Sequence, residues 1–391
     1  MTMLIKILRE IINNIVWFLG LAIAGICHKH NVGSPRLAIV RTDTIGDFVL
    51  FIPALKYIKK KYKNFEIVLI LQDSVSELAE NCPYIDKIIS FNNMKYRRDL
   101  FYKFSLLLRL FRERFSVCLY PIYSRERIGD EMVLWTTADE KIGWDTEIPN
   151  MTIKEKKRGD KAFTKLIKSN FTQQVHENER NKEFLKSLGM KFDSFQNEFW
   201  ISEYEKKKVT NLWSEKNLYP KHVIAIIPCA QTHYRQWGSD KYKLIMKHIE
   251  RIDKDALFII IGSSAEKFIL HFNKNNNFIE NRVLNLCGET SLKELPQLFE
   301  RCFLVIGNET GPLHIAIATG VPTVCIIGGG HFGRFAPYGN PDKNKFVYKK
   351  MNCFNCGWRC IYPTMKCIAE ITVDDVLTEV KELLSTFQKT R

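Results

Sequence analysis

The segment VIGNETGPLHIAIATGVPTVCIIGG, residues 305–329, decides the fold class because apolar and polar runs alternate within it. It predicts a strand, a polar loop, a helix over 312–319, a turn and a second strand over 322–328. A helix between two strands is typical of a βαβ unit, since parallel strands need a crossover connection rather than a tight turn. The segment therefore predicts a parallel sheet.

The same alternation extends over most of the chain. Apolar runs predict further strands at residues 36–40, 65–71, 87–91, 116–122, 222–230, 256–262, 282–288 and 303–307. Intervening patterns predict helices at residues 48–62, 75–81, 101–111, 203–216, 239–252, 265–273, 292–301 and 372–387. This order is typical of α/β folds whose parallel sheets are covered on both faces. For 391 residues we expect an apolar helix within 1–35, a first domain over 36–204 and a second over 205–391.

Charge and hydropathy leave several partners open. The net charge is +15, from 58 Lys and Arg against 43 Asp and Glu. This excess favours an acidic partner such as nucleic acid, an anionic membrane or a phosphorylated substrate, or it is simply a solvated basic surface. The apolar run 15–26 is shorter than the roughly 20 residues of a membrane span. It predicts either a helix lying on a membrane, anchored by Lys6, Arg9 and Trp17, or a helix packed on its own domain.

Unusual polar residues follow the predicted strands, at the sheet edge where open α/β folds bind ligands. In the segment 305–329, Thr310 is suited to cap the helix and Gly311 permits a close backbone approach. The unpaired N–H groups and the dipole of such a helix start favour an anion. His314 follows one turn later and Glu309 adds a carboxylate. Together they predict a phosphate site.

Three further loops carry candidate residues. In RTDTIGDF, residues 41–48, Gly46 allows a close approach, and Asp47 is either a helix cap or a general base. In the loop after strand 222–230, Arg235 is suited to pair with a phosphate. Glu266, soon after strand 256–262, is placed to accept from ribose hydroxyls. The absence of G-x-x-x-x-G-K-[ST] argues against a P-loop NTPase.

Several of these stretches resemble glycosyltransferase family 9, the heptosyltransferases of lipopolysaccharide core assembly. They are RTDTIGDFVLFIPALK, RIGDEMVLWTTADEKIGWD, IPCAQTHYRQW, IGSSAEK and GNETGPLHIAIATGVPTVCIIGG. The resemblance implies a GT-B fold, in which two Rossmann-like doubly wound domains face each other across a cleft. It also implies inverting transfer from a nucleotide-activated sugar, usually ADP-heptose, without a catalytic cofactor or metal.

The resemblance also implies roles for the candidate residues. Asp47 would be the general base that deprotonates the acceptor, and Gly46 would place its backbone near the donor. Arg235 stands where the family usually has Lys, near the diphosphate, and Glu309 stands where the best-known members carry Asp. The remaining donor-binding positions would be Glu266 at the ribose, and Thr310, Gly311 and His314 at the diphosphate and sugar.

The segment CFNCGWRCIYPTMKC, residues 353–367, carries four closely spaced cysteines. Its spacing, C-x₂-C-x₃-C-x₆-C, resembles a four-thiolate metal site. Similar C-terminal cysteines occur in family 9, and related autotransporter heptosyltransferases bind iron with such a cluster. The expected ligands of a structural Zn or Fe ion are Cys353, Cys356, Cys360 and Cys367.

The sequence therefore predicts an inverting, metal-independent glycosyltransferase. We expect a nucleotide-sugar donor, a lipid-linked or core oligosaccharide acceptor, no nucleic acid, and a cytoplasmic position with peripheral contact to the anionic inner membrane. The loops 95–98 and 124–127 are expected to contact the acceptor. The alternatives are a GT-B sugar-nucleotide epimerase, which needs no acceptor, and a non-enzymatic metal-cluster or nucleic-acid-binding protein.

Overall fold

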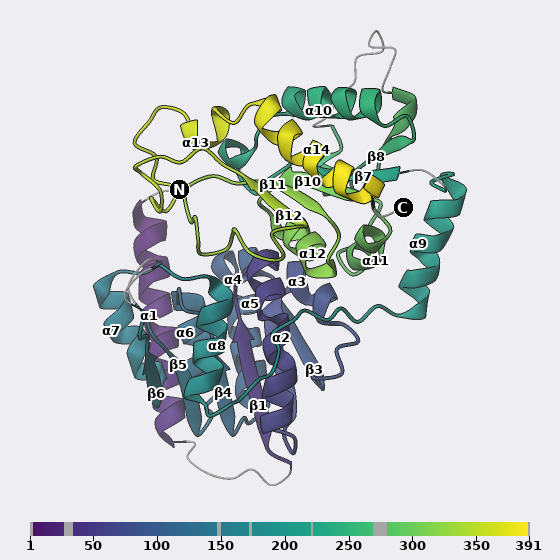
Figure 1. Cartoon of the computed structure of the whole chain (residues 1–391). Coiled ribbons are helices and arrows are strands. Elements are labelled where there is room, and N and C mark those ends of the chain that lie inside the picture. The colour runs from purple at the N-terminus through teal and green to yellow at the C-terminus, as the bar shows by residue number, and fades with distance from the viewer. Residues whose placement is uncertain are drawn as a thin grey trace. The chain divides into compact units, whose positions relative to one another are not determined.

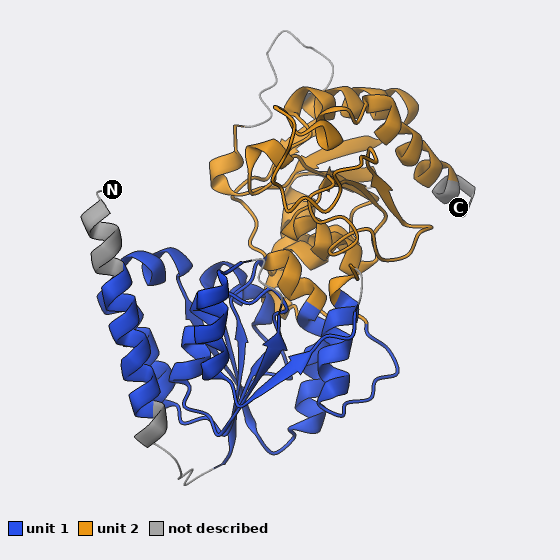
Figure 2. Ribbon diagram, turned by 90° about the vertical axis from the view of Figure 1, so that its left-hand side faces the viewer, with its two compact units in different colours: residues 1–44, 51–173, 178–195 blue, residues 45–50, 174–177, 196–391 orange. Residues whose placement is uncertain are grey.

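A computed structural model describes residues 3–26, 34–146, 150–171, 174–219, 222–268 and 280–389. By their contacts the residues form two compact units, shown in two colours in Figure 2. Unit 1 comprises residues 1–44, 51–173 and 178–195, and unit 2 comprises residues 45–50, 174–177 and 196–391. Residues 45–50, the first residues of one helix, are therefore grouped by their contacts with the C-terminal half of the chain.

Unit 1 is built on a six-stranded parallel sheet of order β3-β2-β1-β4-β5-β6. Its strands are β1 (Arg36–Arg41), β2 (Glu66–Gln72), β3 (Lys87–Phe91), β4 (Val117–Tyr120), β5 (Glu140–Asp145) and β6 (Lys165–Lys168). Its helices are α1 (Met3–Ile26), α2 (Ile45–Lys61), α3 (Asp73–Ser76), α4 (Asn93–Arg98), α5 (Leu100–Arg112), α6 (Arg127–Trp135), α7 (Ile153–Gly159) and α8 (Glu177–Ser187). The apolar side chains of α1, α5 and α6 form one buried cluster with Ala38 and Val40 of β1.

Unit 2 repeats this architecture with the order β12-β11-β10-β7-β8-β9, again all parallel. Its strands are β7 (His222–Ile227), β8 (Ala256–Ile260), β9 (Val283–Asn285), β10 (Leu304–Asn308), β11 (Thr323–Ile326) and β12 (Asn344–Val347). Its helices are α9 (Glu203–Glu215), α10 (Ser239–Ile252), α11 (Leu295–Glu300), α12 (Gly311–Thr319), α13 (Lys366–Ala369) and α14 (Val373–Lys389). In Figure 1, α10 and α14 cover one face of this sheet, and α11 and α12 cover the other.

Both sheets have the same connection pattern. The first strand of each unit, β1 or β7, lies beside the second strand of that unit on one side and beside the fourth on the other. The chain order reverses at this point, which is where doubly wound sheets bind their ligands. The switch points are therefore β1 with β4 in unit 1, and β7 with β10 in unit 2.

The structure adds to and corrects the predicted elements. Strands β5, β6 and β12 were not among the predicted strands, and β6 lies in the Lys-rich stretch 151–215, which carries few strand signals. Helix α2 begins at Ile45 rather than near Phe48, because Thr44 is its N-cap and Gly46 is helical despite its low propensity. Asp47 is consequently inside the first turn and is not the cap. The predicted helix 265–273 is a 3₁₀ turn at Ser264–Glu266 (η4), and residues 269–273 lie outside the described ranges.

Helix α1 packs along unit 1, as one of its two interpretations predicts. Val16 and Trp17 are buried in the core of the unit, and Gly20 approaches Trp135 of α6 so closely that a Cβ would lie 2.7 Å from its Nε1. Within the described ranges, none of the helices combines the length and the hydropathy that a membrane span requires.

Candidate functional site

The ends of β7 and β10 are tied together at the switch point of unit 2. Asn308, the last residue of β10, is buried. Its Nδ2 donates to the carbonyl oxygen of Pro228 at 2.6 Å, and its Oδ1 accepts from the backbone N–H of Trp237 at 3.1 Å. The loops that follow the two strands are therefore held in one fixed arrangement.

Arg235 and Glu309, one from each of these loops, form an ion pair. Nη2 of Arg235 donates to the carboxylate of Glu309 and also, at 3.3 Å, to its carbonyl oxygen. The guanidinium lies over the ring of Trp358, 4.6 Å from the ring centroid, which is the geometry of a cation–π contact. These contacts fix a positive charge beside the residue that precedes Thr310 and α12.

His314, one turn into α12, is buried beside the same carboxylate. Its Nε2 lies 3.3 Å from Oε1 of Glu309, and its Nδ1 lies 2.9 Å from the hydroxyl of Tyr338, whose ring stacks on the imidazole. Burial would raise the pKa of Glu309, but the hydrogen bond from His314 and the charge of Arg235 hold it below its ordinary value. Glu309 is therefore an ionised carboxylate held between two donors.

The start of α12 carries the features of an anion site. Thr310 is the N-cap but its side chain makes no capping hydrogen bond, and its hydroxyl donates instead to the carbonyl oxygen of Asn308 at 3.2 Å. The first N–H groups of α12 thus have no side-chain cap. With the helix dipole they form a position that favours negative charge.

The start of α2 lies directly against the start of α12, and both contacts are within unit 2. A Cβ at Gly46 would lie 2.8 Å from Cδ2 of His314, and a Cβ at Gly311 would lie 2.6 Å from Cβ of Ile45. Real side chains do not come this close, so glycine is required at both positions unless the neighbours shift. The structure therefore brings together Gly46, Gly311 and His314, which the sequence placed far apart.

Asp47 follows Gly46 in the first turn of α2 and is half-buried. Burial and the positive charges of Arg334 and Arg235 hold the pKa of His331 below its ordinary value, while the charges of Glu309 and Asp47 oppose this effect. The charges of both carboxylates therefore act on the pKa of His331. Asp47 belongs to the same charged region of unit 2 as Arg235 and Glu309.

Glu266 lies apart from this group, near the ends of β7 and β8. Its carboxylate accepts from the backbone N–H of Ser263 at 2.6 Å and from the Ser263 hydroxyl at 2.9 Å, which closes a capping box on η4. Burial raises the pKa of the Cys229 thiol, and the neighbouring Glu266 raises it further. Glu266 thus stands at the predicted strand end, and its carboxylate also organises the local turn.

The structure does not support the predicted metal site. Burial raises the pKa of the Cys367 thiol and the charges of the other three cysteines add to this rise, so all four share one region of unit 2. Among the residues that the structure describes, however, no three His, Cys, Asp or Glu side chains are arranged to hold a metal ion. Cys367 is buried in α13, whereas Cys353, Cys356 and Cys360 are half-buried outside helices and strands. The residues as arranged do not fit a four-thiolate Zn or Fe ion.

The sequence did not point to several residues that lie around Arg235, Glu309 and His314. Asn308 stands within the quoted segment 305–329, where a polar residue at the end of an apolar strand was a usable signal. Tyr338, His331 and Trp358 come from irregular segments whose local sequence carries no pattern for this position. Only the folded chain places them beside His314 and Arg235.

The switch point of unit 1 is also polar. The Thr42 hydroxyl, just after β1, lies 3.3 Å from the hydroxyl of Tyr120 at the end of β4. Of the two predicted acceptor loops, residues 95–98 are helical and belong to α4, after β3, whereas Glu126 precedes α6, after β4. An ion pair of 2.8 Å between Arg97 and Glu126 joins the two segments. Arg97 is exposed, so this corner of unit 1 presents a cation at the surface.

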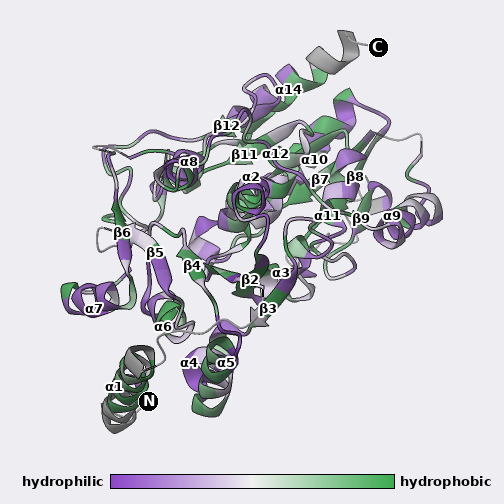
Figure 3. Cartoon of the chain, turned by 90° about the horizontal axis from the view of Figure 1, so that it is seen from below, coloured by the Kyte–Doolittle hydropathy of each residue, from purple (hydrophilic) through white to green (hydrophobic). Residues whose placement is uncertain are grey.

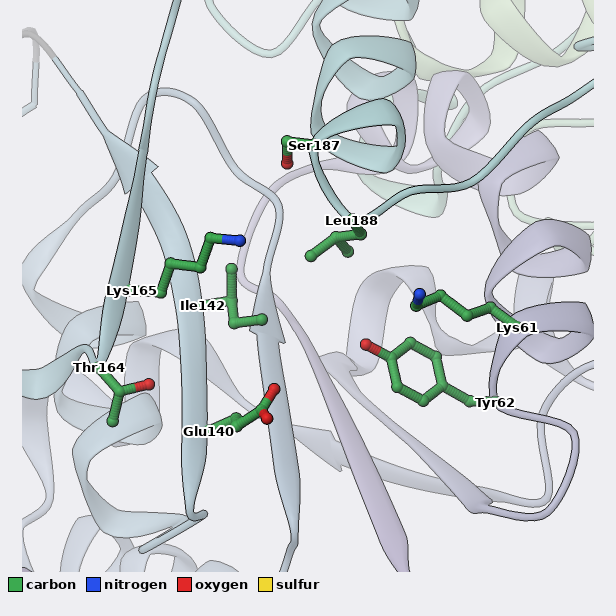
Figure 4. Close-up of a pocket in the computed structure, with 8 residues that line it drawn as sticks. All are labelled: Lys61, Tyr62, Glu140, Ile142, Thr164, Lys165, Ser187 and Leu188. Atoms are coloured by element: carbon green, nitrogen blue, oxygen red, sulfur yellow. The ribbon is translucent and has the colours of Figure 1, made fainter.

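A pocket of about 340 Å³ lies elsewhere in unit 1 and is drawn in Figure 4. It is lined by residues from the end of α2, the starts of β5 and β6, and the end of α8, with Tyr62 and Ile142 among them. It therefore lies at the amino ends of the strands. Ligands of open α/β sheets bind at the opposite edge, so this pocket is not a candidate site.

Comparison with known proteins identifies the family. The model of glycosyltransferase family 9 (heptosyltransferase) matches residues 132–359, more than half of the chain. The chain is 33% identical over 103 residues to lipooligosaccharide heptosyltransferase 2 of Campylobacter jejuni, which is 26% of this chain and 32% of that protein. The match thus spans about a third of the length of this relative.

Two solved structures share the fold. The glycosyltransferase family 9 protein of Veillonella parvula has a TM-score of 0.72 and 17% identity, covering 90% of this chain and 97% of that one. The ADP-heptose lipopolysaccharide heptosyltransferase II of Escherichia coli has a TM-score of 0.66 and 16% identity, covering 90% and 99%. The expected fold class, GT-B with two doubly wound parallel units, is confirmed.

Proposed function

The chain belongs to glycosyltransferase family 9, the heptosyltransferases, and from this premise we propose that it transfers a heptose from ADP-heptose to a lipopolysaccharide-core or related cell-surface glycan acceptor. The donor is supported by the fold shared with the Escherichia coli enzyme, which is described as an ADP-heptose heptosyltransferase. We further propose that transfer inverts the anomeric configuration and uses no catalytic metal.

The observation that carries this proposal is the interlocked pair of helix starts in unit 2. Gly46 lies against His314, and Gly311 lies against Ile45, so Asp47 is held at a fixed position near the start of α12. Transfer from a nucleotide diphosphate sugar requires two groups: a helix start that favours an anion, and a carboxylate, here in the adjoining helix turn. The first binds the leaving group and the second receives a proton.

In the proposed reaction, an acceptor hydroxyl oxygen attacks C1 of the heptose on the face opposite the nucleotide. The bond between C1 and the diphosphate oxygen breaks, and ADP leaves with its electron pair. Asp47 takes the proton of the attacking hydroxyl, so charge and atoms balance. A positioned base of this kind typically contributes about 10²–10⁴-fold to the rate.

The leaving diphosphate gains negative charge as the bond breaks. Arg235 and the N–H groups of Thr310 and Gly311 are the groups of unit 2 that we assign to this charge. We assign the sugar hydroxyls to Glu309 and His314, because an ionised carboxylate held between two donors accepts hydrogen bonds in a defined direction. Glu266, at the end of β8, is assigned to the ribose.

We assign the acceptor to unit 1. The joined segments at Arg97 of α4 and Glu126 follow the carboxyl ends of β3 and β4, and the exposed guanidinium suits a phosphorylated lipid-linked or core oligosaccharide. Such an acceptor places the reaction at the inner face of the inner membrane, with the protein bound peripherally and no role for nucleic acid.

The test compares wild type with Asp47→Asn, and with Asp240→Asn on the exposed surface of α10 as the matched control. Calorimetry measures binding of ADP-heptose, a GDP-hexose and a UDP-hexose, and product analysis measures transfer to a core-lipid acceptor. We expect ADP-heptose to bind all three proteins with similar affinity. Transfer should fall by about 10²–10⁴-fold in Asp47→Asn only.

Each other outcome has a defined meaning. Preference for a GDP- or UDP-sugar overturns the heptose but keeps the reaction class. Conversion of the sugar nucleotide without an acceptor favours the epimerase instead. Failure of every sugar nucleotide to bind overturns the transferase. Full transfer by Asp47→Asn overturns the assignment of the base.

A further inference from the structure

The packed helix α1 is apolar on both of its faces. One face lies on unit 1, where Asn13 accepts a hydrogen bond of 2.7 Å from the buried Lys103 of α5 and where Val16 and Trp17 enter the core. Arg158 of α7 lies over the Trp17 ring, 4.8 Å from its centroid. The helix is therefore fixed against the body of unit 1 along its described side chains.

The opposite face of α1 is exposed and equally apolar. Ile11 is 48% exposed, Ile15 is 53% exposed and Phe18 is 66% exposed, with Leu19 beside them. Residues 11, 15 and 18 are spaced by four and three positions, so they form a single stripe on one helix face. A surface helix of a soluble domain normally presents polar residues there.

Helix α5 extends this apolar surface. Phe101 is 90% exposed, and Leu100 and Phe104 are exposed beside it. The ring of Phe104 lies 5.8 Å from that of Trp135, the same residue that Gly20 of α1 approaches. The two helices therefore flank one side chain of α6, and Figure 3 shows both in the colours of hydrophobic residues on the same side of unit 1.

Cations border this apolar surface on both sides. On α4, beside α5, the side chains of Arg97 and Arg98 are exposed, and on α7, beside α1, those of Lys154 and Lys157 are exposed. Ile153, also on α7, is 60% exposed. An apolar strip with basic flanks is complementary to an anionic bilayer, whose surface attracts the cations while its acyl region accepts the apolar side chains.

We propose that α1, α4, α5 and α7 form a docking surface for anionic phospholipid, with α1 lying flat in the headgroup region. The exposed stripe would enter the interface while the opposite face of α1 stays on unit 1, so the helix binds the bilayer without crossing it. This docking proposal extends the proposed function and rests on it, because a membrane-bound acceptor is the reason for the protein to bind lipid. The surface itself is defined by unit 1 alone.

Vesicle co-sedimentation tests the docking surface without donor or acceptor, so its failure leaves the transferase proposal untouched. The probes are vesicles of phosphatidylcholine alone and of phosphatidylcholine mixed with phosphatidylglycerol. The variant Phe18→Ser/Phe101→Ser removes two exposed rings, and Tyr204→Ser/Leu244→Ser removes exposed apolar side chains of unit 2 as the matched control. Lys154→Glu/Lys157→Glu reverses the charge beside α1.

We expect wild type and the unit 2 control to bind the mixed vesicles, more weakly at high salt, and to bind pure phosphatidylcholine poorly. Phe18→Ser/Phe101→Ser should weaken binding by about tenfold or more. Lys154→Glu/Lys157→Glu should weaken binding to the mixed vesicles only. Transfer to a detergent-dispersed acceptor should stay unchanged in Phe18→Ser/Phe101→Ser.

Two results overturn the docking surface. The first is binding of Phe18→Ser/Phe101→Ser to mixed vesicles with wild-type affinity. The second is a wild-type protein that does not bind vesicles and sediments as a dimer, and whose dimer is dissociated by the same substitutions. The apolar surface would then be an interface between two copies of the chain.

Discussion

Gly46 lies in contact with the imidazole of His314, because a Cβ built on Gly46 would be 2.8 Å from Cδ2 and 3.3 Å from Nε2 of that ring. His314 in turn contacts Glu309 through Nε2 and Tyr338 through Nδ1. The position of the imidazole, and through it the position of Glu309, therefore depends on the absence of a side chain at residue 46.

Substituting Gly46→Ala should destabilise the protein and weaken donor binding. In an ordinary helix this change stabilises by roughly 0.5–1 kcal/mol. Here the added methyl group overlaps the imidazole, and overpacking of this kind typically costs about 1–3 kcal/mol. Urea denaturation measures the free energy of unfolding, and calorimetry measures ADP binding.

The double variant Gly46→Ala/His314→Ala separates the overlap from any general effect of alanine. In the His314→Ala background the imidazole is gone, so Gly46→Ala should be neutral or stabilising. If Gly46→Ala destabilises both backgrounds equally, the contact with His314 is not the cause.

The pH dependence of stability should report on Glu309. Its pKa in the folded protein is lowered below the ordinary value of 4.5, since His314 and Arg235 outweigh the effect of burial. A lowered carboxyl pKa contributes stability that is fully present above 4.5 and is lost as the pH falls through the folded-state value. Glu309→Gln removes this contribution and should cost about 1–3 kcal/mol at neutral pH.

Denaturation of wild type and Glu309→Gln at a series of pH values tests the direction in which stability changes with pH. The difference in free energy of unfolding should be constant at neutral pH and should narrow below pH 4.5. Glu300→Gln, at an exposed position on α11, should stay close to wild type throughout. A difference that widens on acidification would contradict the assigned ion pair.

The sequence predicted the fold well because both sheets are buried on their two faces. Continuous apolar runs such as those of β1, β7 and β10 are strong signals, since such strands carry no polar face. β6, LysLeuIleLys, and β12, AsnLysPheVal, lie at sheet edges and keep polar residues, so neither shows such a run. The pattern thus conceals these two strands, although it reveals the more apolar edge strands β3 and β9.

The candidate site was predictable only where its residues follow a strand. Glu309 and Arg235 stand in loops after β10 and β7, so the sequence could place both at one edge of unit 2. Their ion pair, and the stacking of Tyr338 on His314, depend on distances between loops that no local pattern encodes. The four cysteines show the opposite error: their spacing in the sequence suggests a metal site, but the described residues of the folded segment are not arranged to hold a metal ion.

The buried polar group beneath α1 gives a third prediction. Lys103 donates to Glu131 at 2.8 Å and to Asn13 at 2.7 Å, and the hydroxyl of Tyr96 donates to the same carboxylate at 2.8 Å. Lys103 and Glu131 are buried. Burial lowers the pKa of Lys103, and the charge of Glu131 opposes that effect. Lys103→Met would leave the Glu131 carboxylate buried without its cation, which typically costs about 3–5 kcal/mol.

The double variant Lys103→Met/Glu131→Gln distinguishes loss of the ion pair from loss of packing. Removing both charges should restore most of the stability, because the cost of a broken buried pair comes mainly from the charge that remains. Lys247→Met, at an exposed position on α10, should change the free energy of unfolding by no more than about 0.5 kcal/mol. If the double variant is as unstable as Lys103→Met, the charge left on Glu131 is not the cause of the instability, which contradicts the prediction.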